Sequence, residues 1–286
     1  MTSLTTTWHR ARRTAEPRPR FTNLVRAEWT KLWSLRSTIW VLSGSGLAVV
    51  AANANGAYAD YRNLPHYDAA AQAAFTPGWA AFDAFTSLAA TLAILAMSCV
   101  GAISVVGEYS SGLIRTTFTA VPARGAVMAA KIVVVTGVTT VFGALVAGIS
   151  FWVSQAILSG RHAGLSTAEP GALRLVVASA LLAPLCTIIG MALGALIRTT
   201  AATIVTAILV LLVLPTAMNE NRYWGAVLAH TLPRVAWGRL TEIQEGAGPS
   251  IVSPFPWSVG GAWTVYAAWA IASILITIIS VQRRDQ

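Results

Sequence analysis

The sequence predicts an all-α membrane protein with six transmembrane helices, and two observations lead to this prediction. Hydrophobic residues make up 55% of the 286 residues and charged residues only 11%, against about 25% in a typical soluble domain. Six stretches are also apolar over the roughly 20 residues needed to cross a bilayer. They cover about residues 37–59, 84–106, 132–158, 174–197, 199–217 and 258–281.

The distribution of basic residues predicts the orientation of these spans. Six spans place both termini on one side of the membrane. The terminal segments, the 107–131 connection and Arg198 together hold fourteen Lys and Arg residues, whereas the opposite connections hold six. Because basic residues accumulate on the cytoplasmic side, we expect a multi-pass protein of the cell inner or plasma membrane with both termini in the cytoplasm. The net charge of +9 then follows from topology and requires no nucleic acid partner.

The segment before the first span divides into two parts. Residues 1–20 are rich in Thr, Arg and Pro without apolar periodicity, which predicts a disordered cytoplasmic tail; residues 21–286 form the membrane domain. From Phe21 to Arg36, apolar residues recur every three or four positions and include Trp29 and Trp33. This pattern predicts an amphipathic helix in the inner headgroup layer. The alternative is a plain extension of the first span, and the long basic region disfavours a cleavable signal peptide.

The connection from Gly107 to Lys131 is the longest stretch between the spans on the terminal side. Glu108 and Arg115 are seven residues apart and share one face of a helix, while Leu113, Ile114 and Phe118 supply apolar side chains. Pro122 then interrupts the helix. The pattern predicts a short amphipathic helix at the cytoplasmic membrane face, with a plain hairpin turn as the alternative.

Two connections on the opposite side are rich in aromatic residues. In the connection before the second span, Tyr61, Tyr67, Phe75 and Trp79 suit an aromatic belt at the outer interface. In residues 219–257, an apolar run at 224–232 is too short to cross the membrane. We expect one or two short re-entrant or interfacial outer helices before the last span, with a simple ordered loop as the alternative.

Motifs for catalysis and cofactor binding are missing from the sequence. It contains no GxxxxGK phosphate loop, no HExxH and no GxSxG, and its four histidines lie in separate connections. We therefore expect no catalytic residues, no metal site and no cofactor in this chain. Gly190 and Gly194 form a GxxxG pattern, which predicts close helix packing either within the chain or between two copies.

Two segments resemble a known family. The run Gly107-Glu108-Tyr109, Gly112-Leu113-Ile114-Arg115, Pro122, Arg124 and Lys131 resembles the first cytoplasmic loop of the permease subunits of type-2 ABC transporters. The run Arg26-Ala27-Glu28-Trp29-Thr30-Lys31-Leu32 with Arg36 resembles the N-terminal amphipathic helix of bacterial members. The order of the remaining elements is similar over nearly the whole chain, so residues 21–286 resemble one six-helix permease domain.

The resemblance implies a multi-subunit complex. The chain would pair with itself or with a second permease, and two copies of a cytoplasmic ATPase would bind ATP and Mg, so that the permease itself is not an enzyme. A coupling helix in the first cytoplasmic loop would contact the ATPase, and its residues here are Glu108, Tyr109, Ser110, Ser111, Gly112, Leu113, Ile114, Arg115 and Phe118. A second docking surface would comprise Arg26, Glu28, Lys31 and Arg36.

The expected function is export of an apolar or amphipathic solute, such as a drug, an antibiotic, a peptide or a lipid-like molecule. One alternative is a non-transporting assembly or sensory component with the same fold. An ion-coupled secondary transporter is less consistent with the sequence, because no ionisable residue lies well inside a span. An intramembrane enzyme is disfavoured because the sequence shows no nucleophile–base or metal-binding set.

Overall fold

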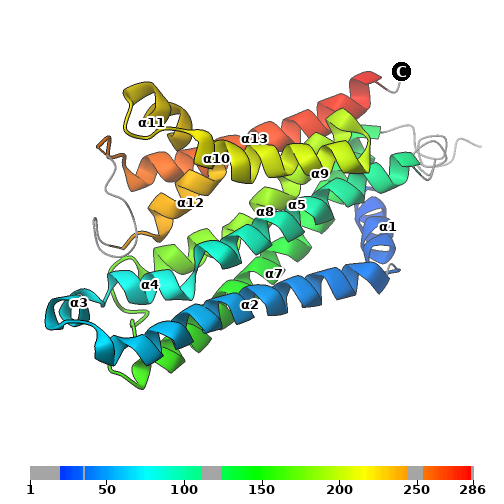
Figure 1. Ribbon diagram of the computed structural model, residues 1–286. Coiled ribbons are helices and arrows are strands. Elements are labelled where there is room, and N and C mark those ends of the chain that lie inside the picture. The colour runs from blue at the N-terminus through cyan, green and yellow to red at the C-terminus, as the bar shows by residue number, and fades with distance from the viewer. Residues whose placement is uncertain (1–19, 35, 111–123, 244–253, 285–286) are drawn as a thin grey trace, which may run out of the picture.

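The computed structural model describes residues 20–34, 36–110, 124–243 and 254–284, and these residues contain helices but no β-strand (Figure 1). Six of the helical segments are long and apolar enough to cross a membrane, as the sequence predicts. These segments are Arg36–His66, Gly78–Tyr109, Arg124–Ser159, Ala172–Ile197, Thr200–Ala217 and Val259–Gln282.

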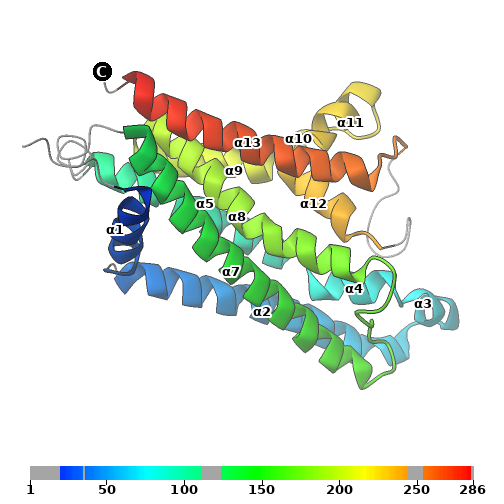
Figure 2. The ribbon, with the colours of Figure 1, turned by 180° about the vertical axis from the view of Figure 1, so that it is seen from behind.

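The helices follow one another as a long bundle with short helices at its ends. In chain order they are α1 (Phe21–Ser34), α2 (Arg36–Asn63), α3 (Ala69–Ala74), α4 (Gly78–Ala84), α5 (Ser87–Ser110), α7 (Arg124–Ser159), α8 (Ala172–Ile197), α9 (Thr200–Ile208), α10 (Leu214–Ala217), α11 (Tyr223–His230), α12 (Pro233–Thr241) and α13 (Val259–Arg284). A π-helical turn, Leu209–Val213, joins α9 to α10. Helix α1 and the last turn of α13 lie at one end of the bundle, called the terminal end below (Figures 1 and 2). Helices α3, α4, α11 and α12 lie at the opposite end.

Helix α8 is the centre of the bundle and packs against α5, α7 and α13. Glycines allow its backbone to approach two of these neighbours. A Cβ atom on Gly101 of α5 would lie 1.9 Å from the Thr187 carbonyl oxygen, and one on Gly143 of α7 would lie 2.1 Å from the Ala180 carbonyl oxygen. Such close backbone contacts give membrane helices dispersion attraction that larger residues would prevent.

The GxxxG pattern of α8 faces α5 of the same chain. A Cβ atom on Gly190 would lie 2.2 Å from the Ser98 carbonyl oxygen, and one on Gly194 would lie 3.2 Å from the Ala102 carbonyl oxygen. Of the two packing arrangements open from the sequence, intrachain or between copies, the structure places these glycines in an intrachain contact.

The span expected at 84–106 occurs as α5, and a break at its start separates it from the short helix α4. Phe85 leaves helical geometry with φ −145° and ψ 70°. The Oδ1 atom of Asn53 on α2, which is only 1% exposed, accepts hydrogen bonds from Thr86 N at 2.9 Å and from Thr86 Oγ1 at 3.1 Å. A free backbone amide inside a membrane protein needs such a partner. Asn53 therefore compensates the helix break from a neighbouring span.

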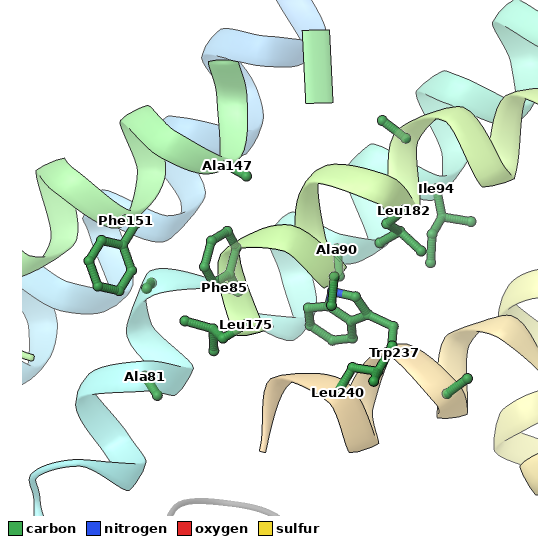
Figure 3. Close-up of a cluster of buried hydrophobic side chains, with 14 of the residues drawn as sticks. Ala81, Phe85, Ala90, Ile94, Ala147, Phe151, Leu175, Leu182, Trp237 and Leu240 are labelled. Carbon is green, nitrogen blue, oxygen red and sulfur yellow. The ribbon is translucent and has the colours of Figure 1, made fainter. Parts of the chain in front are cut away.

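Two short helices, α11 and α12, occupy the connection before the last span, as expected; their position relative to a membrane stays a prediction. Helix α12 packs into the core through Trp237 and Leu240 (Figure 3). Phe75 also belongs to this core and is 2% exposed, so its assignment to an aromatic belt is wrong. The sequence did not show this because burial at the ends of the bundle depends on how the short helices fold back.

Candidate functional site

Four charged side chains meet at the terminal end of the bundle, where α1 crosses the end of α5 and the start of α7. They are Glu28, Lys31, Glu108 and Lys131, and they are called the charge junction below. The Nζ atom of Lys131 lies 2.5 Å from Glu28 Oε2 and 2.9 Å from Glu108 Oε1. The Nζ atom of Lys31 lies 3.1 Å from Glu28 Oε1 and also contacts Glu108 Oε1. Each lysine therefore bridges both carboxylates.

The positions of the four residues on their helices bring their charged groups together. Leu24, Glu28 and Leu32 are spaced by four residues and lie on one face of α1, which packs mainly against α7. Glu108 lies in the last turn of α5, and Lys131 lies two turns inside α7. Helix α1 thus carries a carboxylate on its otherwise apolar face, directly above the ammonium group of α7.

The junction is almost closed to solvent. Glu28, Glu108 and Lys131 are 6%, 7% and 3% exposed, whereas the Lys31 side chain is 36% exposed. An apolar layer that includes Val105, Met128, Ile132, Val135, Met191, Ala195 and Val281 lies at this end of the bundle. Buried charges are tolerated only when paired. The two ammonium groups and two carboxylates of the junction meet this requirement.

The carboxylates stabilise the charged form of Lys31. Partial burial by itself lowers the pKa of the Lys31 ammonium group, but the hydrogen bond and charge of Glu108, together with those of Glu28, outweigh burial and raise the pKa above its usual value. Lys31 is therefore protonated at neutral pH.

The two lysines of the junction are the only lysines in the chain, whose other basic residues are eighteen arginines. An ammonium group is a compact point charge with three rotatable donors, while a guanidinium group is a flat fork. The compact group suits a position between two carboxylates from different helices. A reagent that modifies primary amines therefore labels only the two lysines of the junction and the amino terminus.

A further cation lies beside the junction. Arg198, in a left-handed conformation with φ 63°, ends α8 through its N–H bond to the Gly194 carbonyl at 2.9 Å. Its guanidinium carbon lies 4.6 Å from the centroid of the Tyr109 ring. This cation–π contact connects the short turn between α8 and α9 to the end of α5.

The residues of the expected coupling helix fall into two groups. Glu108 is buried in the junction, Tyr109 lies against Arg198, and Ser110 is the last residue of α5. The other members lie outside the described residues: Ser111, Gly112, Leu113, Ile114, Arg115 and Phe118.

The residues of the expected second docking surface also divide. Glu28 and Lys31 belong to the junction, whereas Arg26 and Arg36 are exposed. Trp29 and Trp33 are 51% and 39% exposed and meet edge to face, with ring centroids 5.7 Å apart. The arginines and tryptophans of this segment are therefore exposed, whereas Glu28 is buried.

The partnership between Glu28 and Lys131 is the feature that sequence reasoning missed. The signal was present, because an acidic residue, Glu28, stands on the apolar face of α1 and Lys131 stands directly before the expected third span, 132–158. The two ammonium groups and two carboxylates of the junction neutralise one another, so the arrangement can hold α1, α5 and α7 together. Within the described segments, His, Cys, Asp and Glu side chains form no group able to hold a metal ion.

Comparison with known proteins adds no family to this picture. A scan against models of protein families finds no match to this chain, and a search of curated proteins finds no match either. The functional argument therefore rests on the geometry of the charge junction and on the sequence of the segments that meet there.

Proposed function

We propose that this chain is the membrane permease subunit of an ATP-driven exporter of the type-2 ABC class, acting with a separate cytoplasmic ATPase on an apolar or amphipathic solute. One observation carries the proposal. The charge junction joins the two segments that would receive motion from the ATPase, namely α1 and the ends of the helices that flank residues 111–123.

The junction supplies a mechanical route from these segments to the spans. Lys131 lies near the start of α7, Glu108 lies at the end of α5, and Glu28 and Lys31 lie in α1. Their ion pairs connect these three helices. Removing one partner of a buried ion pair typically costs about 3–5 kcal/mol. A displacement of α1, or of the segment between α5 and α7, therefore moves both spans together, and α5 and α7 pass that motion to α8, against which both pack.

In this proposal the charged residues have separate tasks. Glu28 and Glu108 position the helices from inside, because their carboxylates face the lysines and are nearly closed to solvent. Arg26 and Arg36 are exposed on the same segment and are the residues available to contact acidic groups of an ATPase. Trp29 and Trp33 are suited to the headgroup layer, which would keep α1 parallel to the membrane surface.

The proposal is tested by co-expressing the full chain with the P-loop ATPase of a neighbouring reading frame. We expect a stable complex whose ATP hydrolysis is stimulated by exported solutes. Replacing Arg26 and Arg36 by Glu should weaken the complex, whereas Glu28→Gln should reduce the stimulation by solute more than it reduces ATPase binding. Arg161→Gln, an exposed arginine at the opposite end, is the matched control. ATP hydrolysis by the chain alone, or failure of any such ATPase to bind, would refute the proposal.

A further inference from the structure

A cavity of about 260 Å³ opens at the opposite end of the bundle, between α4, the start of α5 and α12. Arg234, Thr241 and Glu242 line it from the side of α12, and Ser87 and Phe82 line it from the side of α4 and α5. The cavity thus has a polar side on the connection before the last span.

The carboxylate that lines this cavity already has a basic partner. Glu242 is neutralised by Arg239, whose Nη1 atom lies 2.9 Å from Glu242 Oε2. Arg174 binds the same segment by donating to the carbonyl oxygens of Leu240, at 3.1 Å, and of Glu242. Among the described residues that line the cavity, Arg234 is therefore the basic side chain, and the acidic one, Glu242, is already paired with Arg239.

Arg234 is the cation available to a ligand. Its guanidinium carbon lies 4.6 Å from the centroid of the Trp237 ring, and among the described residues no carboxylate forms an ion pair with it. Burial lowers the pKa of Arg234, with Tyr266 opposing the change. Arg234 is therefore partly buried and has no carboxylate partner within the described residues, a state that a bound anion would relieve.

A small apolar space lies on the inner side of the cavity wall. Phe85 and Trp237 line both the cavity and a second space of about 40 Å³, which is otherwise lined by residues such as Ala90, Ala147 and Leu182. Figure 3 shows Phe85 and Trp237 among these side chains in the core. Phe85 and Trp237 therefore give the cavity an apolar inner wall opposite its polar side.

We propose that this cavity binds an anionic amphiphile, with its phosphate or carboxylate group on Arg234 and its apolar part against Phe85 and Trp237. Pockets for drug-sized ligands occupy roughly 300–1,000 Å³, so a cavity of about 260 Å³ accommodates a head group and the first part of the chain, which would lie against the Phe85 and Trp237 side chains. The ligand is either a bilayer lipid or the transported solute. Its identification as transported solute rests on the proposed function, whereas the binding site does not.

Direct binding to the purified full chain tests the site. Decyl phosphate is the probe, decyltrimethylammonium carries the opposite charge, and inorganic phosphate represents the head group alone. We expect decyl phosphate to bind at least about tenfold more tightly than either, because charge and chain are both recognised. Arg234→Gln should weaken decyl phosphate binding by about tenfold, and Arg234→Lys, which keeps the charge but loses the planar fork, by less.

Arg161→Gln is the matched control, because Arg161 also lies over an aromatic ring, at 4.8 Å from the Tyr61 centroid, but does not line this cavity. Nanodiscs distinguish the two ligand sources. Competition by phosphatidylglycerol, and not by phosphatidylcholine, identifies a lipid; stimulation of ATP hydrolysis by decyl phosphate in the ATPase complex identifies a solute.

Unchanged binding in Arg234→Gln, or an equal loss in Arg161→Gln, would overturn the site. Failure of the ATPase to associate would refute the proposed function while leaving the binding result intact.

Discussion

The Nζ atom of Lys131 and the Oε2 atom of Glu28 lie 2.5 Å apart, although 103 residues separate them in the sequence. This ion pair joins the amphipathic helix α1 to the third span, and both side chains are at least nine-tenths buried. The pair makes α1 a structural part of the bundle, beyond its expected role as a helix lying on the membrane surface.

Mutations that unbalance the charge junction are expected to destabilise the protein strongly. Lys131→Met leaves two buried carboxylates with one ammonium group, and we expect a loss of about 3–5 kcal/mol. The double variant with Glu28→Gln should lose less than the two single variants together, because it removes a complete pair. Thermal unfolding in detergent measures both, with exposed Arg26→Gln as the control. Additive effects would show that the pair carries no coupling energy.

Amine labelling is expected to distinguish the two lysines. Lys31 is partly exposed and Lys131 is 3% exposed. Reductive methylation followed by peptide mass spectrometry should modify Lys31 readily and leave Lys131 protected. Glu28→Gln should release α1 and increase the modification of Lys131, whereas Arg36→Gln should not. Equal modification of both lysines in the unaltered protein would contradict the described packing of α1.

Alkaline pH is expected to weaken the junction. The pKa of Lys31 is raised in the folded protein, so its stabilising contribution is complete below the unfolded value, about 10.4. That contribution declines as pH rises through this value toward the folded pKa. We expect the melting temperature to fall over this range, and to fall less in Lys31→Arg, whose guanidinium group stays charged. Identical pH profiles for the two proteins would exclude this role of Lys31.

Replacing Asn53 is expected to destabilise the break between α4 and α5. Asn53→Ala leaves the Thr86 amide and hydroxyl groups buried without their acceptor, which costs about 1–3 kcal/mol for such a group. Asn55→Ala is the matched control, because Asn55 lies on the same helix and is exposed. Thermal unfolding should show a loss for Asn53→Ala only. A loss of the same size at both positions would contradict the proposed compensation.

Enlarging a glycine at the α5–α8 contact is expected to separate the helices. Gly101→Ala would place Cβ 1.9 Å from the Thr187 carbonyl oxygen, a distance that requires movement of backbone. Gly137→Ala on α7 meets no atom within 4 Å and replaces a poor helix former by a good one. We therefore expect a lower melting temperature for Gly101→Ala and an unchanged or higher one for Gly137→Ala. The reverse order would refute the close packing.

The number of spans and the amphipathic helix were predictable because both depend on local pattern. About 20 apolar residues suffice to cross a bilayer whatever their neighbours are, and all six expected segments occur as helices of sufficient length. The start of the second span near residue 84 was predictable, whereas the hydrogen bonds that Asn53 provides there were not, because Asn53 comes from another span.

The sequence by itself determined an all-helical bundle with six apolar spans, a helix before the first span and short helices before the last. Only the tertiary structure decided which charges meet. Glu28 pairs with Lys131, and Arg234 faces a cavity shared by α4, α5 and α12. Hydrophobic length is a property of each segment alone, whereas an ion pair or a cavity exists only once distant helices have packed, and a single sequence carries no measure of that packing.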